Sequence, residues 1–251
     1  METINKGDIF KVGNHVIACG DCLDSEFVRK IIGINKIRAV ITDPPYGVAY
    51  VENKKDFVNL AVKNNKVIVG DHLQSDEEYR KFTRDWLSCV TTHLEKYNTC
   101  YIFNCDLMYP ALRLGMKDSG YFYSQMLVWL KNQPVMGRKD YLSMFELIAY
   151  GWYGKHKAEH SVGKNVIFHP RPVKSSLHPT QKPVGLLRKI IPHATKLHEY
   201  IYDPFLGSGT TAVACEHLRR RCIGIELDPE YVRKAIRRLE TLTKVKAVRV
   251  A

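Results

Sequence analysis

Residues 38–47, Arg-Ala-Val-Ile-Thr-Asp-Pro-Pro-Tyr-Gly, join a short apolar run to an unusual turn. The run Arg38–Ile41 predicts a buried strand. The strand must end at the prolines, because they lack the N–H that a sheet needs and push the preceding residues into extended geometry. The turn presents the Asp43 carboxylate, backbone carbonyls and the Tyr46 ring. Hydrogen-bond acceptors beside an aromatic face suit the binding of a planar ring that carries an amino group. The alternative is a structural turn, in which Asp43 has hydrogen-bond partners within the protein and Tyr46 packs against the core.

Length and charge limit the classes of protein to consider. The chain has 251 residues, with 38 Lys and Arg against 26 Asp and Glu. This length predicts one domain with a full core. The formal net charge of +12, with a pI near 9.3, favours a polyanionic partner such as nucleic acid, or describes a merely basic protein.

The cysteines and the terminus favour a reduced compartment. Seven cysteines without a secretory context indicate free thiols, and we expect a cytoplasmic, nucleoid-associated protein. Cys19 and Cys22 have the spacing of a zinc or redox pair, but no second such pair completes a zinc site, so no metal is expected. The segment Met1–Lys11 is too polar for a signal peptide, and no apolar run is long enough to span a bilayer.

Short apolar runs alternate with amphipathic stretches along the whole chain. Helices are predicted at 25–32, 76–97, 107–119, 183–194, 211–218 and 229–239, and strands at 15–19, 38–41, 99–103, 124–129, 145–150, 200–202 and 222–225. Residues 156–176 show no clear period, and residues 47–66 are rich in lysine and predicted to be mobile. This alternation predicts an α/β fold with a doubly wound parallel sheet.

Four of the predicted strands finish in or beside a carboxylate. These carboxylates are Asp21, Asp43, Asp203 and Glu226. Because ligands of doubly wound sheets bind at the carboxyl ends of the strands, we expect the four to share one rim. Like charges on one rim are costly unless donors lie among them, which predicts a ligand with hydroxyls, amines or positive charge.

A glycine motif follows the strand that ends at Asp203. Residues 205–212, Phe-Leu-Gly-Ser-Gly-Thr-Thr-Ala, lie between a strand and a helix, where glycines let the backbone approach a ligand. Gly207, Gly209 and Ala212 also fit the dinucleotide fingerprint, with Glu226 where a ribose-binding acid would lie. This half alone does not separate a nicotinamide cofactor from another adenosine-bearing one.

Four motifs together resemble one enzyme family. They are Thr-Asp-Pro-Pro-Tyr-Gly at 42–47, His-Pro-Thr-Gln-Lys-Pro at 178–183, Asp-Pro-Phe-Leu-Gly-Ser-Gly-Thr-Thr at 203–211 and Gly-Ile-Glu-Leu-Asp-Pro-Glu-Tyr at 224–231. The set resembles the β class of amino-methylating DNA methyltransferases, in which the catalytic motif precedes the glycine motif. The resemblance implies a single domain over 1–251 with a Rossmann-like S-adenosylmethionine-dependent methyltransferase fold, a catalytic half at about 12–150 and a cofactor half at about 177–240.

The resemblance implies S-adenosylmethionine as cofactor and assigns residues to it. Glu226 would accept from the ribose hydroxyls, Asp21 from the adenine amino group, and Lys182 would approach the methionine carboxylate. The implied cofactor set is Asp21, Cys22, Asp43, His178, Thr180, Lys182, Asp203, Phe205, Gly207, Ser208, Gly209, Thr210, Glu226 and Leu227. The region around 178–182 also suits a loop packed on the sheet.

The resemblance also implies the chemistry of residues 43–46. Asp43 and the carbonyl of Pro44 would each accept one N–H from an amino group on a base flipped out of the duplex, and Tyr46 would stack on that base. Pro45 completes the turn. Relatives with Asp before Pro-Pro-Tyr mostly methylate adenine at N6, and those with Ser mostly methylate cytosine at N4. Relatives usually carry His-Glu where this chain has Phe145 and Glu146, which leaves the role of that position open.

Double-stranded DNA is the implied partner, and no membrane is expected. The candidates for phosphate contacts lie in the loop 47–66 and in the short basic segment 154–176, namely Lys54, Lys55, Lys63, Lys66, Lys155, Lys157 and Arg171. Family analogy adds a homodimer and a cognate restriction endonuclease. Rival interpretations are cytosine N4 methylation, an RNA substrate, protein glutamine methylation with its Asn-Pro-Pro-Tyr signature, and a non-catalytic nucleic-acid-binding subunit.

Overall fold

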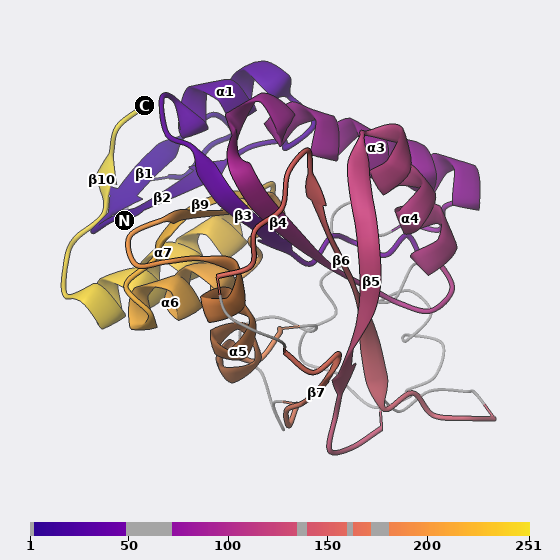
Figure 1. Cartoon of the computed structure of the whole chain (residues 1–251). Helices are drawn as coiled ribbons and strands as arrows, with labels where there is room; N and C mark the ends of the chain where they lie inside the picture. Colours follow the sequence, from indigo (N-terminus) through magenta and orange to yellow (C-terminus); the bar gives the residue numbers. More distant parts are fainter. Residues whose placement is uncertain (1–2, 49–71, 135–139, 160–162, 172–180) are drawn as a thin grey trace.

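The computed structural model describes residues 3–48, 72–134, 140–159, 163–171 and 181–251. Within these residues the strands form one ten-stranded sheet in the order β10-β1-β2-β9-β8-β3-β4-β6-β5-β7 (Figure 1). The strands are β1 Ile9–Val12, β2 His15–Cys19, β3 Ile37–Thr42, β4 Leu94–Asn104, β5 Tyr121–Leu130, β6 Phe145–Tyr153, β7 Val166–Phe168, β8 Tyr200–Asp203, β9 Arg221–Glu226 and β10 Val248–Arg249.

The direction of the strands confirms a mostly parallel sheet. Each neighbouring pair in the run β2-β9-β8-β3-β4 is parallel. Strand β6 is antiparallel to both β4 and β5, and β1 is antiparallel to β2 and β10. Because β9 and β8 lie between β2 and β3, strands from distant parts of the sequence alternate in the middle of the sheet.

Helices cover both faces of the sheet. Figure 1 shows α1, α3 and α4 on one side and α5, α6 and α7 on the other. Their bounds are α1 Ser25–Ile32, α3 Asp76–Val90, α4 Tyr109–Asp118, α5 Val184–Ala194, α6 Thr210–His217 and α7 Pro229–Thr243, with a 3-10 turn η1 at Thr91–His93. Each layer buries its own apolar core against the strands, which is the doubly wound arrangement expected from the sequence.

Capping residues explain where several helices begin. The Asp24 side chain accepts from the first-turn N–H groups of α1, and Asp228 does the same for α7. Ser75 and Glu78 form a reciprocal capping box at the start of α3. Each cap satisfies N–H groups that have no partner inside the helix.

Several predictions for the elements were wrong in their bounds, and strands β1 and β10 were not predicted. The helix predicted to reach residue 97 ends at Val90, and Leu94–Tyr97 already belongs to β4. Hydrophobic spacing did not separate them because the short turn η1 joins α3 to β4 without a glycine or proline. The segment predicted to lack a period contains β7, whose three residues are too few to show alternation. Strand β5 begins at Tyr121, three residues before its predicted start.

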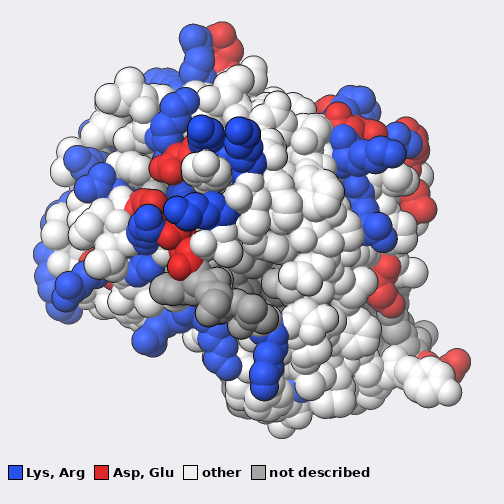
Figure 2. All heavy atoms as spheres, in the orientation of Figure 1, with Lys and Arg blue, Asp and Glu red and all other residues white. Residues whose placement is uncertain are grey.

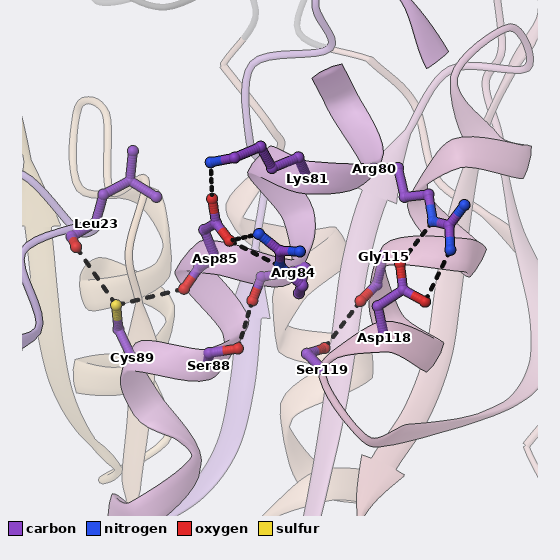
Figure 3. Close-up of polar contacts among 10 residues, drawn as sticks. All are labelled: Leu23, Arg80, Lys81, Arg84, Asp85, Ser88, Cys89, Gly115, Asp118 and Ser119. Carbon is purple, nitrogen blue, oxygen red and sulfur yellow. Dashed lines mark hydrogen bonds and ion pairs between the residues drawn. The ribbon is translucent and has the colours of Figure 1, made fainter. Parts of the chain in front are cut away.

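Helix α3 holds together two parts of the chain that flank the sheet (Figure 3). The Arg80 guanidinium donates to both carboxylate oxygens of Asp118 in α4, at 2.6 and 3.1 Å. On the other side, the Cys89 thiol donates to the Leu23 carbonyl at 3.5 Å. Since Leu23 follows Asp21 and Cys22, this contact anchors the turn after β2 to α3.

The described residues contain no helix that is long and apolar enough to cross a membrane. The same residues contain no group of three or more His, Cys, Asp or Glu side chains placed to hold a metal ion. Cys19 and Cys22 are free thiols, and both are buried.

Candidate active site

The four carboxylates predicted to share a rim do lie at one edge of the sheet. Asp21 follows β2, Glu226 ends β9, Asp203 ends β8 and Asp43 follows β3, and these four strands are consecutive and parallel. The edge therefore carries acceptors in the order Asp21, Glu226, Asp203, Asp43. Because Asp203 and Asp43 are neighbours in this order, the turn at 42–47 lies beside the glycine motif at 205–212.

Asp203 connects the two motifs from inside the protein. Its Oδ1 accepts from the Thr42 hydroxyl at 2.7 Å and from the Phe205 N–H at 3.2 Å. Burial raises the pKa of this carboxyl to about 6, against the lowering effect of the donors from Thr211, Thr42 and Phe205. Asp203 is only 3% exposed, so its contacts fix the backbone of both turns.

Glu226 shapes the glycine loop. Its Oε2 accepts from the Gly207 N–H and its Oε1 from the Asp228 N–H, both at 2.8 Å. The carboxylate remains partly exposed, so further lone pairs can accept from a ligand. Desolvation by its surroundings raises the pKa of Glu226 to about 7, and the nearby charges of Asp228 and Asp203 add to this.

The rest of the glycine motif packs against α7. A Cβ at Gly209 would lie 2.8 Å from the Cβ of Ala235, and Gly209 has a φ of +83°. Arg238 of α7 donates to the Ser208 carbonyl at 2.6 Å and lies 3.2 and 3.3 Å from the hydroxyls of Ser208 and Thr210. The Arg238 side chain therefore holds the loop to α7, and Gly209 packs closely against Ala235 of the same helix.

The turn after β2 lies beside Glu226, because β2 pairs with β9 through Cys19 and Glu226. Asp21 accepts from the Leu23 N–H at 3.0 Å, and Cys22 is buried beneath the turn. Asp21 is only partly buried, as is required of a group that contacts a ligand.

An aromatic group that the sequence analysis did not single out supports Phe205. The Phe205 ring lies 5.6 Å from the ring of Phe82 and 5.5 Å, edge-on, from that of Trp86, measured between centroids. Both residues come from α3, where their helical spacing had indicated only a core face. Phe205 is partly exposed at the same edge as Glu226. Leu227, which follows Glu226 in the sequence, is 39% exposed.

Lys182 lies against the turn at 43–46. Its ammonium donates to Asp43 Oδ2 at 2.5 Å and to the Tyr46 hydroxyl at 3.2 Å. The Tyr46 hydroxyl has one hydrogen to donate and lies 2.8 Å from Asp43 Oδ1 and 3.0 Å from Glu146 Oε2. Lys182 therefore contacts the catalytic motif, whereas the sequence analysis assigned it to the methionine carboxylate of the cofactor.

Two further charged residues complete this cluster. Glu146 Oε2 lies 3.0 Å from the Lys182 ammonium, and Glu146 Oε1 lies 2.7 Å from the ammonium of Lys131. The two lysines are 4% and 7% exposed. Glu146 belongs to β6, and Lys131 directly follows β5. The sequence analysis left Glu146 without a role and missed Lys131, for which only its position after an apolar strand gave a signal.

The protonation of the cluster follows from burial and from these charges. Desolvation raises the pKa of Asp43, the charge of Glu146 adds to this, and Lys182 opposes it. Lys182 and Lys131 outweigh desolvation at Glu146 and lower its pKa, while the two carboxylates raise the pKa of Lys182. Burial and both carboxylates raise the pKa of Tyr46, so its hydroxyl stays a donor.

The predicted DNA contacts divide into three groups. Arg171 lies near the end of β7, where it donates to the Pro134 carbonyl at 2.9 Å. Lys155 and Lys157 lie at the opposite edge of the sheet: Lys155 bridges to Tyr97, and the Lys157 carbonyl accepts from Arg38 at the start of β3. The structure does not bring these two lysines to the candidate site. His178, Thr180, Lys54, Lys55, Lys63 and Lys66 lie outside the described residues.

A mostly parallel α/β sheet with acceptors and a glycine loop at its carboxyl edge defines a nucleotide-cofactor enzyme of the doubly wound class. A sequence model of N6 and N4 methyltransferases, described as DNA methylase, matches residues 37–171 and 163–237. The chain therefore belongs to this DNA methylase family.

Individual relatives agree with the family. The type II methyltransferase M2.DpnII of Streptococcus pneumoniae is 28% identical over 222 residues, which cover 80% of this chain and 81% of that protein. The type II methyltransferase M.HpaI of Haemophilus parainfluenzae is 26% identical over 247 residues, covering 88% of this chain and 73% of that protein.

Solved structures share the fold. The M1.HpyAVI–SAM complex superimposes with a TM-score of 0.64 and 26% identity, covering 88% of this chain and 98% of that one. The cytosine-N4-specific PvuII DNA methyltransferase superimposes with a TM-score of 0.71 at 17% identity, covering 96% and 94% of the two chains.

Proposed function

We propose that this enzyme transfers the methyl group of S-adenosylmethionine to the N6 amino group of adenine in double-stranded DNA. The observation that carries the proposal is the placement of Asp43 and Tyr46 on the rim that also holds Asp21 and Glu226. A base amino group at Asp43 and an adenosine cofactor at Glu226 would share that rim. DNA methylation by an N6 or N4 methyltransferase is the activity of the family.

The residues on this rim fit the cofactor. Glu226 and Asp21 are partly exposed carboxylates on adjacent strands, which suits the hydroxyls of a ribose and the amino group of adenine. Phe205, packed on Phe82 and Trp86, offers an aromatic wall beside them. The similar M1.HpyAVI was solved as a SAM complex. The bound cofactor supplies a methyl group on a sulfonium, which is electrophilic.

Positioning and electrostatics account for the chemistry. The lone pair of an aromatic amino nitrogen is delocalised into the ring, so the nitrogen is a poor nucleophile. Asp43 and the Pro44 carbonyl, by accepting its two N–H groups, would localise that lone pair and aim it at the methyl carbon. On transfer, the amino nitrogen would lose one proton, which Asp43 would be placed to accept, and the demethylated cofactor would leave as a neutral thioether.

The target atom lies inside the duplex, so the base must be flipped out to reach Asp43. The Tyr46 ring would stack on the flipped base. The Lys182 ammonium donates to the Tyr46 hydroxyl at 3.2 Å and lies 5.5 Å from the ring centroid, so it is at the hydroxyl end of the ring and not over its centre.

The choice of adenine over cytosine rests on one residue, Asp43. Asp43 stands where the family's adenine N6 enzymes mostly carry Asp and its cytosine N4 enzymes mostly carry Ser. The likeness to the cytosine-N4-specific PvuII enzyme concerns the fold, since the identity is 17%. Cytosine N4 is the second candidate, and product analysis separates the two.

We propose that the DNA contacts the rim and the lysines that follow the catalytic turn in sequence. We assign phosphate contacts to Lys54, Lys55, Lys63 and Lys66, which follow the catalytic turn in sequence, and to Arg171. Figure 2 shows Lys and Arg spread over the helical part of the visible face, interspersed with fewer Asp and Glu, while the surface over β5 is largely uncharged. A homodimer and a restriction endonuclease acting at the same site are part of this proposal, by analogy with the type II relatives.

Methyl transfer to DNA tests the function directly. The enzyme is incubated with S-adenosylmethionine labelled in its methyl group and with unmethylated genomic DNA, and the nucleosides are then analysed. The expected product is N6-methyladenine, formed by the wild type and lost in Asp43→Ala and Tyr46→Ala. Label in N4-methylcytosine would overturn the choice of base, and label in total RNA but not in DNA, in parallel incubations, would overturn the substrate. Near wild-type turnover in Asp43→Ala would overturn the catalytic assignment.

A further inference from the structure

The Lys182 ammonium has a complete set of partners. An ammonium carries three N–H donors, and here they face three acceptors: Asp43 Oδ2 at 2.5 Å, the Tyr46 hydroxyl at 3.2 Å and Glu146 Oε2 at 3.0 Å. The nitrogen also lies 5.4 Å from the centroid of the Phe103 ring, which covers it from the sheet. Lys182 is 7% exposed, so it has little access to water as a replacement partner.

This arrangement makes Lys182 a competitor of the substrate for Asp43. A substrate amino group must donate to Asp43, whose carboxylate has further lone pairs, but the Lys182 ammonium already lies 2.5 Å from Oδ2 on that side. A buried ammonium that simply lost Asp43 would bear a large desolvation cost. Glu146 removes that difficulty, because it is a second carboxylate already within contact of the same ammonium.

We propose that Lys182 occupies the amino-group site at Asp43 until substrate arrives and then withdraws to Glu146, with Glu146 and Lys131 acting as the residues that position it. The inference rests on the proposed function, because it takes the amino group of a base as the incoming donor. Lys131 holds the far oxygen of Glu146 at 2.7 Å, which fixes the carboxylate facing Lys182. Lys182 is thus a placeholder that keeps Asp43 ionised and oriented.

The charges around Asp43 make the proposal quantitative. The described groups that face it are Tyr46 in its own turn, Glu146 on β6, Lys182 before α5 and Asp203 at the end of β8; Lys131 after β5 contacts Glu146, and Cys105 lies beyond Tyr46. The two lysines balance Asp43 and Glu146. Lys131→Met leaves the four-residue cluster with an extra negative charge, Glu146→Gln leaves it with an extra positive charge, and the double variant restores the balance.

The pH dependence of methyl transfer is the first test. If Asp43 must be ionised, the acid limb of kcat/KM on unmethylated genomic DNA follows its protonation. Lys131→Met is expected to move that limb to higher pH by about one unit, and Glu146→Gln to lower pH by about one unit, as nearby charges typically do. The double variant is expected near the wild-type position. Glu146→Gln also loses turnover at every pH, because Lys182 no longer has a carboxylate to withdraw to.

Matched controls separate positioning from folding. Lys189→Met removes a lysine of α5 whose ammonium donates to the Phe168 carbonyl at 2.8 Å, and it is expected to leave the limb unchanged. If Lys131→Met does not fold, Lys131→Gln removes the same charge and keeps a donor. Opposed shifts show that the charges of Lys131 and Glu146 act on Asp43, and the loss of turnover in Glu146→Gln at pH values where Asp43 is ionised tests the withdrawal of Lys182; full turnover there would overturn it. Shifts of the same sign, or no shift in either variant, would overturn the proposal.

A second readout keeps this inference separate from the proposed function. In free protein labelled with ¹³C at the Asp carboxyl carbons, the Asp43 signal is assigned by its loss in Asp43→Asn and followed against pH. The same opposed displacements are expected in Lys131→Met and Glu146→Gln. If the wild type methylates no nucleic acid, the function fails while this titration still decides the positioning. If the wild type methylates DNA and the Asp43 titration is the same in all variants, the positioning fails alone.

Discussion

The Thr42 hydroxyl donates to the carboxylate of Asp203 at 2.7 Å, across 161 positions of sequence. Thr42 is the last residue of β3 before the catalytic turn, and Asp203 is the last residue of β8 before the glycine loop. The contact therefore sets the distance between the base-binding turn and the cofactor-binding loop. Asp203 is an internal brace between two turns, and its carboxylate faces the protein.

The ionisation of Asp203 makes stability depend on pH. Burial raises its pKa to about 6 in the folded protein, from about 3.9 in the unfolded chain. Between these values the folded state holds a proton that the unfolded state has lost, so this group stabilises fully below about pH 4 and its contribution is lost as pH rises to about 6.

We expect Asp203→Asn to remove this dependence. Relative to the variant, the wild type should lose roughly 2–3 kcal/mol of unfolding free energy between pH 4 and pH 7, since one pKa unit corresponds to about 1.4 kcal/mol. Urea unfolding at a series of pH values measures the difference. Parallel pH curves for the two proteins would show that Asp203 titrates normally, against the brace described above.

Cofactor affinity should depend on Glu226. Its pKa is raised to about 7, and ribose hydroxyls donate to its ionised form, so binding of S-adenosylmethionine should weaken by up to tenfold per pH unit below about pH 7 and level off above it. Glu226→Gln and Asp21→Ala should each weaken binding by roughly ten- to a hundredfold at pH 8. Only Glu226→Gln should also abolish the pH dependence.

Isothermal titration calorimetry between pH 5.5 and 8.5 is the measurement. The control is Glu77→Gln, which changes a carboxylate on α3 whose side chain is 82% exposed, and it should alter neither affinity nor its pH dependence. Unchanged affinity in both Glu226→Gln and Asp21→Ala would move the adenosine site away from β2 and β9. Tight binding of NAD would instead favour a dehydrogenase cofactor.

Gly209 should be intolerant of a side chain because of α7. Gly209→Ala places a Cβ 2.8 Å from that of Ala235 at a φ of +83°, and we expect a loss of roughly 2–4 kcal/mol from strain and overpacking together. Gly154→Ala is the control for strain alone, since its φ is +68° and no atom lies within 4 Å of its Cβ; it should lose roughly 1–2 kcal/mol. Urea unfolding compares the two, and Gly209→Ala with Ala235→Gly should recover the packing part. Equal losses in both single variants would remove the packing argument.

The residues at the edge of the sheet could be predicted from the sequence, because their position depends only on where each strand ends. The rule that ligands meet the carboxyl ends of parallel strands required only that Asp21, Asp43, Asp203 and Glu226 each follow a strand, and that information is local. Helix α1 was predicted with its observed bounds from its hydrophobic spacing, and in the structure Asp24 caps its start and Gly33 follows its end. The start of β4 was missed because η1 gives no local signal of a break.

Partners between distant elements were beyond the sequence. The contact of Lys182 with Asp43 depends on how the chain before α5 lies over the end of β3, and no spacing within a motif contains that information. Lys131 and Glu146 meet only because β5 and β6 pair in register, which aligns Leu130 with Phe145. Ser208 and Thr210 were assigned to the cofactor, and the sequence did not indicate that their hydroxyls also lie 3.2 and 3.3 Å from Arg238. Such pairings follow from tertiary packing between elements that are distant in the sequence.

The position of Lys155 and Lys157 provides an internal control for the DNA path. The Lys157 carbonyl accepts from Arg38 near the start of β3, and Asp43 directly follows the end of that strand. Arg38 and Asp43 are therefore about 15 Å apart along β3. Lys54 and Lys55 follow the catalytic turn by a few residues in sequence. Each phosphate contact adds about 0.9 to the slope of log affinity against log salt concentration.

Neutralising Lys54 and Lys55 together to Gln should therefore flatten that slope by up to roughly two units, with an equal loss of affinity on all DNA sequences, because phosphate contacts position the protein without specifying a site. The Lys155→Gln, Lys157→Gln protein has the same net charge and should keep the wild-type slope. Fluorescence anisotropy with duplexes of two unrelated sequences, from 50 to 300 mM salt, measures both. A flattened slope in the second protein and not in the first would place the DNA at the opposite edge of the sheet, and equal flattening in both would mean that binding follows net charge alone.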